Sequence, residues 1–467
     1  MTTEHTTNQA AEFRVVLLVP STSRIIVERH SIGFRLPRVS VAVSARIAEA
    51  IPDEIRKTWT IQTVPLDFLM MGSRVSLAIA ELRSPGWNFN SAGLTTIPLE
   101  DIDGQELNEE ARTRVKKILG GDTQDRSPFS RLGWIEDVQA WIRTSESFPV
   151  QFNEDIRSYS PISTFTLARL GICGGGAYWL KAPHSQNRTE LSVTQALSRY
   201  CADFLPRLVA VRKEWNAWIT EEMGQPIHHA SCLASYEKAV RCLAGIQIAS
   251  IDHIKELLAS GCFDQRISVL KSSLCHLEGY LGESMRLIGA ANASSADARL
   301  LEVSVALVQD ACLALQEIGI HDAIIHNDLN PGNILVDDER AVLIDWAESC
   351  IGMPFVSFHH LLVQAQERGL LHSDCQQLVT TYKRCWTKYF SEERIDRAFA
   401  LVPPVAIASY VVGRDPLFKS PERFISAVQE FAGNLARHFI RAAQSSDFRG
   451  ALAAYQSTET LCHVRNS

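Results

Sequence analysis

Short apolar runs separated by turn residues dominate the first 120 residues, and this pattern predicts β-strands joined by tight turns. The runs that predict strands are residues 14–19, 24–29, 34–41 and 74–82. Residues 44–51 predict a short helix that Pro52 stops, because proline cannot donate the main-chain hydrogen bond that a helix interior needs. Residues 107–119 predict a charged amphipathic helix. We therefore expect a small α+β domain over residues 1–120, with residues 1–12 mobile.

The next segment, residues 121–160, is expected to be a linker followed by a docking helix. Gly, Asp, Ser, Pro and Arg dominate its beginning, which is typical of a linker. Residues 134–142 then carry Ile135, Val138 and Ile142 at helical spacing. This apolar stripe would pack the first domain against the part of the chain that follows.

Residues 161–225 combine strand patterns with a glycine loop. Predicted strands at 164–170 and 177–182 flank the loop, which contains Gly174, Gly175 and Gly176. Glycines without a Cβ let main-chain N–H groups approach phosphate oxygens. Taken alone, these glycines fit an ordinary hairpin turn equally well. Their position directly before a strand ending in Lys181 favours a nucleotide loop.

Helical periodicity dominates residues 226–467. A helix predicted at 303–319 leads directly into the segment Ile325-His326-Asn327-Asp328-Leu329-Asn330-Pro331-Gly332-Asn333. Two apolar runs, residues 334–336 and 342–344, follow this loop around a polar turn and predict a β-hairpin. A hairpin would bring Asn333, before its first strand, beside Asp345, after its second.

The residue types in this loop match the needs of phosphoryl transfer. One carboxylate must orient and deprotonate a hydroxyl, and oxygen ligands must hold Mg²⁺ against the phosphates. Asp328, Asn333 and Asp345 supply these groups within 18 residues. Asp, Asn, Pro and Gly between apolar runs are also ordinary turn formers. The complete string, including His326 and Asp345-Trp346, favours a catalytic loop over turn chemistry alone.

These motifs resemble the catalytic core of the aminoglycoside phosphotransferase and choline kinase family. The resemblance implies a bilobal protein-kinase-like fold, with a small β-rich N-lobe over 161–225 and a helical C-lobe over 226–467. It further implies transfer of the γ-phosphate of ATP, or of another nucleoside triphosphate, to a small-molecule hydroxyl. Asp328 would be the catalytic base, and Asn333 and Asp345 would be the Mg²⁺ ligands. His326 would brace the loop.

The same resemblance assigns residues of the N-lobe to the nucleotide. Lys181 matches the strand lysine that contacts the α- and β-phosphates, and Glu190 is the best match for the glutamate that pairs with it. Glu190 lies only nine positions after Lys181, so the helix of Glu190 must begin almost at once. A solvated glutamate in a first helical turn is the competing interpretation of Glu190. Residues 219–223, with Glu221, fall at the expected inter-lobe hinge, where main-chain groups would meet the adenine.

The first domain resembles a Nudix-type domain in the order of its elements. A working Nudix hydrolase holds its metals with glutamates of the Nudix box, on one helix. Residues 38–49 stand at that place here, and the Arg-Glu and Glu-Glu pairs of the box are missing. We therefore expect a degenerate Nudix-like fold without hydrolase activity.

Composition narrows the classes of function. The net charge of −7 and the pI near 6.1 argue against a nucleic-acid-binding surface. No run of about 18 apolar residues predicts a membrane span, and the N-terminus lacks a secretory signal. The 11 cysteines are scattered without a C-x-x-C pair, and Cys242, Cys312 and Cys385 are expected to be small core residues. A cytoplasmic location follows most simply.

Three functions remain open from the sequence. The leading hypothesis is an ATP- and Mg²⁺-dependent O-phosphotransferase that acts on a small-molecule alcohol. The second is a nucleotide-binding regulatory protein of the pseudokinase type, which would bind nucleotide without transferring phosphate. The third places a hydrolase in residues 1–120. The sequence does not identify the acceptor, the choice between ATP and GTP, the role of the first domain or the oligomeric state.

Overall fold

The computed structural model describes residues 10–31, 33–71, 74–83, 93–121, 127–159, 165–183, 188–229, 232–288, 295–414 and 425–465. Residues 1–9, the turn at Ser84-Pro85-Gly86 and the predicted strand start at Thr164 lie outside these ranges. The chain forms two compact units. Unit 1 contains residues 1–191 and 207–222, and unit 2 contains residues 192–206 and 223–467.

Unit 1 begins with a seven-stranded mixed sheet in the order β3-β2-β1-β6-β5, in which β4 also pairs with β1 and β7 with β2. Strands β1 and β6 run parallel, and the other pairs are antiparallel. The strands are β1 (Ala10–Leu18), β2 (Arg24–His30), β3 (Gly33–Arg35), β4 (Arg38–Ala42), β5 (Thr63–Met71), β6 (Arg74–Leu82) and β7 (Leu94–Pro98). Side chains of β1 alternate between two cores, because successive residues of a strand face opposite sides of the sheet. Val15 and Leu17 lie in one core and Val16 and Leu18 in the other.

The helix predicted at 44–51 is longer than expected, and Pro52 does not stop it. Helix α1 (Ile47–Trp59) continues through Pro52 for two further turns. Pro52 is the sixth residue of α1, past the first turn, where a proline normally costs a main-chain hydrogen bond. The buried stripe of Ile51, Ile55 and Trp59 explains the continuation, because these residues pack on the sheet.

One other local prediction for this domain was wrong, and one strand was missed. The single strand predicted at 34–41 is split into β3 and β4 at Leu36-Pro37, since proline has no N–H for a strand ladder. Strand β5, which contains Pro65, was not predicted. It lies at the edge of the sheet, where a missing donor is tolerated.

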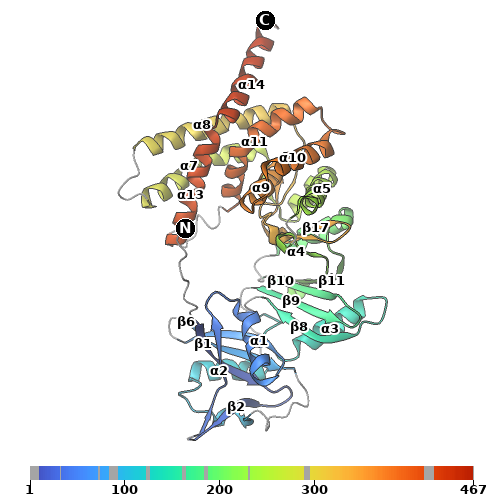
Figure 1. The fold of residues 1–467 in the computed structure, drawn as a ribbon, viewed down its shortest axis with the longest axis vertical. Helices are drawn as coiled ribbons and strands as arrows, with labels where there is room; N and C mark the ends of the chain where they lie inside the picture. Colours follow the sequence, from blue (N-terminus) through green and yellow to red (C-terminus); the bar gives the residue numbers. More distant parts are fainter. Residues whose placement is uncertain are drawn as a thin grey trace. The chain divides into compact units, whose positions relative to one another are not determined.

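A second sheet in unit 1 contains five antiparallel strands in the order β11-β12-β10-β9-β8 (Figure 1). They are β8 (Phe152–Ser158), β9 (Phe165–Ile172), β10 (Ala177–Pro183), β11 (Leu208–Arg212) and β12 (Ala217–Glu221). Strands β9 to β12 lie within residues 161–225, the segment predicted to be the N-lobe. Strand β8 lies in the segment that was expected to be linker and docking helix. Helix α4 (Thr189–Tyr200) follows β10 and starts in unit 1.

One hydrophobic cluster joins the two sheets of unit 1. It contains Val16 and Val27 of the first sheet, Leu170 and Leu180 of the second, and helices α2 (Glu109–Leu119) and α3 (Trp134–Ser145). Trp134, Ile135, Val138 and Ile142 of α3 are all buried in this cluster. The predicted stripe of α3 therefore does pack the first domain against the second sheet.

Unit 2 is mainly helical (Figure 1). Its helices are α5 (Leu233–Ser250), α6 (Ile254–Ala259), α7 (Ile267–Ile288), α8 (Ser295–Ile318), α9 (Phe355–Glu367), α10 (His372–Trp386), α11 (Glu392–Gly413), α13 (Ser426–Ala443) and α14 (Ser446–Arg465). Two small sheets, β13-β16-β17 and β14-β18-β15, lie among them. Their strands are β13 (Gln225–Pro226), β14 (Phe263–Gln265), β15 (Ala323–Ile325), β16 (Ile334–Val336), β17 (Ala341–Leu343) and β18 (Cys350–Gly352). The predicted class, α+β with a β-rich first part and a helical second part, is confirmed.

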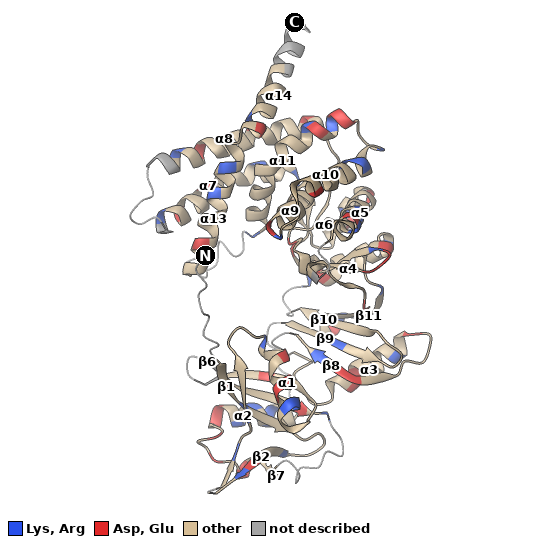
Figure 2. Cartoon of the chain, viewed as in Figure 1, with Lys and Arg blue, Asp and Glu red and all other residues tan. Residues whose placement is uncertain are grey.

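Helix α11 lies at the centre of unit 2. Among the described helices it alone is long and apolar enough to cross a membrane by length and composition, yet 56% of that stretch is buried. Ile395, Leu401 and Val405 belong to the core of unit 2, which explains the composition. Cys242 and Cys312 are buried core residues as predicted, and the ten described cysteines are free thiols. Acidic and basic residues are interspersed over the drawn parts of both units (Figure 2).

Candidate active site

The predicted catalytic loop follows β15 and is braced by buried groups of unit 2. The His326 N–H donates to Ser357 Oγ of α9 at 2.9 Å. The His326 ring nitrogen Nε2 lies 2.8 Å from the main-chain carbonyl oxygen of Ile344. Both His326 and Ser357 are almost fully buried. The predicted bracing role of His326 is confirmed, and Ser357 is a support that sequence reasoning missed.

The predicted hairpin is formed by β16 and β17, and its register places the two expected metal ligands side by side. Ile334 pairs with Leu343, and one step outward the Ile344 N–H donates to the Asn333 carbonyl at 3.0 Å. Asp345 follows directly. The hairpin therefore carries Asn333 and Asp345 at the same end, as the spacing of apolar and polar residues indicated.

Asn333 also fixes the predicted base. Its Nδ2 donates to the main-chain carbonyl of Asp328 at 2.9 Å and to Oδ2 of Asp328 at 3.3 Å. Asn330 Nδ2 contacts the same Oδ2 at 3.2 Å. The Asp328 side chain remains 39% exposed, so a hydroxyl can reach it. The loop thus presents a fixed carboxylate to solvent.

Asn333 and Asp345 carry side-chain oxygens of the kind that Mg²⁺ prefers, and their role as ligands stays a prediction. Because the amide nitrogen of Asn333 is fixed on Asp328, its Oδ1 faces the opposite way and can act as a ligand. Asp345 adopts a left-handed backbone conformation with φ of 68°, which is costly for a residue with a Cβ. Among the described residues, no three His, Cys, Asp or Glu side chains form a metal cage. Mg²⁺ sites commonly use one or two carboxylates together with phosphate oxygens.

The predicted ion pair of unit 1 is present. Lys181 Nζ of β10 lies 2.6 Å from Glu190 Oε1 in the first turn of α4. The side chain of Glu190 is 3% exposed and that of Lys181 is 19% exposed. The interpretation of Glu190 as a solvated surface residue was therefore wrong. The short spacing is possible because α4 begins at Thr189, one residue before Glu190.

The glycine loop closes the hairpin between β9 and β10. Gly174, Gly175 and Gly176 have φ values of 92°, 104° and 83°, a region that side chains with a Cβ avoid. The Ile172 N–H donates to the Gly176 carbonyl at 3.1 Å and closes the turn. The conformation accounts for three consecutive glycines, and their contact with phosphate stays a prediction.

Glu221, predicted at the hinge, ends β12. Its N–H donates to the Arg207 carbonyl at 3.1 Å, and its carboxylate contacts the Arg207 guanidinium at 2.6 Å. The next residue, Glu222, accepts two hydrogen bonds from Arg169, at 2.5 and 2.9 Å. Both carboxylates thus anchor the end of the strand, and any contact of Glu221 with adenine would use its main-chain carbonyl.

Sequence reasoning missed a guanidinium next to the predicted base. Arg414, at the end of α11, places Nη2 2.7 Å from Glu348 Oε2 and 3.7 Å from Asp328 Oδ1. Its guanidinium carbon lies 3.5 Å from the centre of the Tyr410 ring. Burial raises the pKa of Glu348, and Arg414 opposes this rise. Glu348 lies three residues after Asp345, but Arg414 is distant in sequence and only the tertiary fold brings it here.

The residue before Arg414 touches the same loop. A Cβ added to Gly413 would lie 2.1 Å from Nδ2 of Asn327 and 2.9 Å from Nε2 of Gln265. Asn327 is buried, and neither end of its amide has a hydrogen-bond partner in the described structure. The absence of a side chain at Gly413 therefore lets α11 approach the catalytic loop closely.

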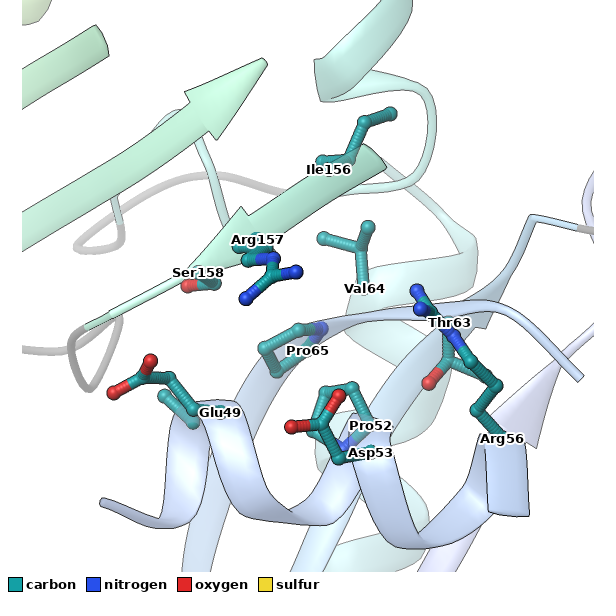
Figure 3. Close-up of a pocket in the computed structure, with 11 residues that line it drawn as sticks. Glu49, Pro52, Asp53, Arg56, Thr63, Val64, Pro65, Ile156, Arg157 and Ser158 are labelled. Atoms are coloured by element: carbon teal, nitrogen blue, oxygen red, sulfur yellow. The ribbon is translucent and has the colours of Figure 1, made fainter. Parts of the chain in front are cut away.

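Unit 1 also contains a hollow, and none of the predicted site residues lines it (Figure 3). It is lined by Ala48, Glu49, Pro52, Asp53, Arg56, Thr63, Val64, Pro65, Ile156, Arg157 and Ser158. The hydroxyls of Thr63 and Ser158 are buried and lack hydrogen-bond partners among the described residues. Burial raises the pKa of Glu49, which Arg46 counteracts. The lining thus combines the acids Glu49 and Asp53 with the arginines Arg56 and Arg157.

A known protein family matches the segment of the chain that contains the catalytic loop. The model of the phosphotransferase enzyme family matches residues 200–377, from the end of α4 through the catalytic loop and hairpin to α10. The resemblance predicted from the motifs is confirmed for this segment. None of the curated proteins matches the chain significantly.

Several solved structures are similar to the chain at low identity. A macrolide 2′-phosphotransferase from Brachybacterium faecium has 13% identity and a TM-score of 0.42, covering 64% of this chain and 98% of its own. A choline kinase from Streptococcus pneumoniae has 13% identity and a TM-score of 0.38, covering 69% and 99%. An aminoglycoside phosphotransferase from Alicyclobacillus acidocaldarius has 15% identity and a TM-score of 0.41, covering 68% and 95%. Similarity at this level does not extend to acceptor or activity.

Proposed function

We propose that this protein transfers the γ-phosphate of ATP, or of another nucleoside triphosphate, to a hydroxyl of a small molecule. The observation that supports this most strongly is the set of contacts among Asp328, Asn333 and the β16–β17 hairpin. Asn333 holds the predicted base through two contacts of its Nδ2. The hairpin register sets Asp345 beside Asn333. The match of residues 200–377 to the phosphotransferase enzyme family supports the same proposal.

The chain's own residues divide the work of the reaction. Asp328 would accept the proton of the attacking hydroxyl, which must come within about 3 Å of its carboxylate. Asn333 and Asp345 would hold Mg²⁺, which supplies charge neutralisation at the phosphates when bound. Lys181, oriented by Glu190, would contact the α- and β-phosphates, and Gly174, Gly175 and Gly176 would offer main-chain donors. Most of the rate enhancement would come from positioning and electrostatics.

The proposed setting is the cytoplasm, with a small-molecule acceptor and without a nucleic-acid or membrane partner. The first domain is proposed to act in support of the second sheet of unit 1 and not as a hydrolase. This follows from the shared hydrophobic cluster and from the missing Nudix-box acids.

An ATP-consumption screen tests the proposal. Aminoglycosides, amino alcohols, sugars and nucleosides are offered with Mg²⁺ and ATP or GTP, and the Asp345→Ala variant serves as the blank. The proposal predicts nucleotide consumption by the natural sequence that the blank lacks. Nucleotide-induced thermal stabilisation without transfer to any acceptor would instead identify the regulatory, pseudokinase-type alternative.

A further inference from the structure

The charge around the predicted base bears on which acceptors it can use. An acceptor hydroxyl must lie within about 3.2 Å of the Asp328 carboxylate to give up its proton. Arg414 Nη2 is 3.7 Å from Asp328 Oδ1. A hydroxyl bound to Oδ1 therefore lies at most about 7 Å from Arg414 Nη2, because this separation cannot exceed the sum of the hydroxyl–Oδ1 and Oδ1–Nη2 distances.

Among the described residues, Arg414 occupies one carboxylate and one aromatic face that could otherwise bind an ammonium group. A cationic acceptor would be bound by a carboxylate and by the face of an aromatic ring. The carboxylate next to the base is Glu348, and it pairs with Arg414 at 2.7 Å. The ring is Tyr410, and the Arg414 guanidinium covers its face at 3.5 Å from the ring centre.

The guanidinium is also held in place. Arg414 Nη1 donates to the Tyr410 carbonyl at 3.4 Å, in addition to the contacts with Glu348 and the ring. Its side chain is only 12% exposed, so solvent screens its charge weakly. Gly413 allows the approach, because a Cβ there would collide with Asn327. The end of α11 therefore builds a fixed positive charge into the acceptor side of the loop.

We infer that Arg414 determines specificity by excluding ammonium-bearing acceptors, so that the enzyme acts on hydroxyl compounds that are uncharged or anionic near the reacting hydroxyl. This inference rests on the proposed function. It narrows the acceptor class from amino alcohols and aminoglycosides to polyols, sugars and hydroxy acids. Arg414 is a specificity residue here, and Asp328 remains the base.

The test uses acceptors matched in shape and different in charge. Ethanolamine, ethylene glycol and glycolate form one set, and glucosamine, glucose and glucuronate form a second. ADP formation is measured with Mg²⁺ and ATP for the full chain and for the variants Arg414→Gln, Arg414→Lys and Glu348→Gln. Arg397→Gln is the matched control, because Arg397 lies on the same helix against another ring, Tyr455, and away from the loop.

The inference predicts that the natural sequence disfavours the amine of each set at least tenfold against its uncharged member. Arg414→Gln should reduce that ratio at least fivefold, because its activity on the amines should rise. Loss of structure would not produce such a gain of activity. Arg414→Lys should retain the exclusion, Glu348→Gln should strengthen it, and Arg397→Gln should leave it unchanged. Circular dichroism of each variant verifies folding.

Three results would overturn the inference. They are preference of the natural sequence for amines, a ratio that Arg414→Gln does not change, and ADP formation that responds to no member of either set. In each case the proposed phosphotransferase function would still stand if the natural sequence consumed ATP and Asp345→Ala did not. Absence of any ATP use by the natural sequence would instead reject the proposed function, and this inference with it.

Discussion

Lys181 donates to Glu190 across 2.6 Å, and both side chains are largely withdrawn from solvent. A charge pair in such surroundings loses more when one partner is removed than an exposed pair does, because the remaining charge stays buried. The short distance along the sequence makes this a local feature, formed by the end of β10 and the first turn of α4.

The first prediction concerns this pair. Lys181→Met should lower kcat/KM for ATP by about tenfold or more, because the phosphates lose a positioned positive charge. Lys57→Met is the matched control, since Lys57 pairs with Glu54 at the same distance of 2.6 Å but is 69% exposed. An exposed pair contributes little. Equal effects of both substitutions would contradict the assigned role of Lys181.

The second prediction concerns the shared core of unit 1. Trp134→Ala should reduce the free energy of unfolding of unit 1 by about 3–5 kcal/mol, because Trp134 is buried in the hydrophobic cluster that both sheets share. ATP affinity should fall as well, since the same core supports β10. Phe148→Ala removes an aromatic ring that is 52% exposed and should change neither quantity. Thermal unfolding and nucleotide titration measure both effects.

The third prediction concerns pH. Burial raises the pKa of Glu81 to about 7, while the Gly133 N–H that it binds at 3.1 Å opposes the rise. The folded state therefore binds a proton that the unfolded state has lost between about pH 4.5 and 7. The stability that protonated Glu81 provides is fully present below pH 4.5 and is lost as pH rises from about 4.5 through about 7.

Glu81→Gln stays neutral and should remove this loss, which is on the order of 3 kcal/mol for a shift of about 2.5 pKa units. Unfolding of the natural sequence and of Glu81→Gln between pH 4.5 and 8 measures the difference. Glu109→Gln, at a side chain that is 81% exposed, is the control. Parallel pH profiles for the natural sequence and Glu81→Gln would show that Glu81 is ionised throughout this range.

The fourth prediction concerns the contact between α11 and the catalytic loop. Gly413→Ala should destabilise unit 2 by about 1–3 kcal/mol and slow phosphoryl transfer, because the new Cβ would lie 2.1 Å from Asn327. Gly450→Ala, in α14, meets no atom within 4 Å. It should stabilise its helix by about 0.5–1 kcal/mol. If Gly413→Ala behaves like Gly450→Ala, the loop tolerates displacement and the close approach is unimportant.

Local sequence signals predicted the catalytic loop well. The polar turn between two apolar runs fixed the hairpin register, and with it the adjacency of Asn333 and Asp345. The Lys181–Glu190 pair was expected from the family resemblance, and spacing alone left a solvated Glu190 as the competing interpretation. The hairpin and its loop depend on neighbours within about 18 residues, so pattern and spacing determine them.

Features that depend on distant packing could not be predicted in this way. Arg414 reaches Asp328 only because α11 packs in the core of unit 2, and nothing in the sequence near residue 414 indicates this contact. Helix α1 passes through Pro52 because Ile55 and Trp59 are buried against strands that the sequence did not fully reveal. Ser357 supports His326 from another helix. In each case the deciding contact joins residues that are distant in the sequence, so the local pattern could not indicate it.

The central claim is that Asp328 and Asp345 perform phosphoryl transfer, and its most direct test is the rate of γ-phosphate transfer from ATP in variants of these residues. Asp338→Ala is the matched control, because Asp338 is an exposed residue in the turn of the same hairpin. The account predicts that Asp328→Ala and Asp345→Ala each lower the Mg²⁺-dependent rate by about 100-fold or more, with nucleotide binding largely retained in Asp328→Ala. Asp338→Ala should stay within about twofold of the natural sequence, as expected for an exposed site. Full activity of either Asp328→Ala or Asp345→Ala would contradict the account.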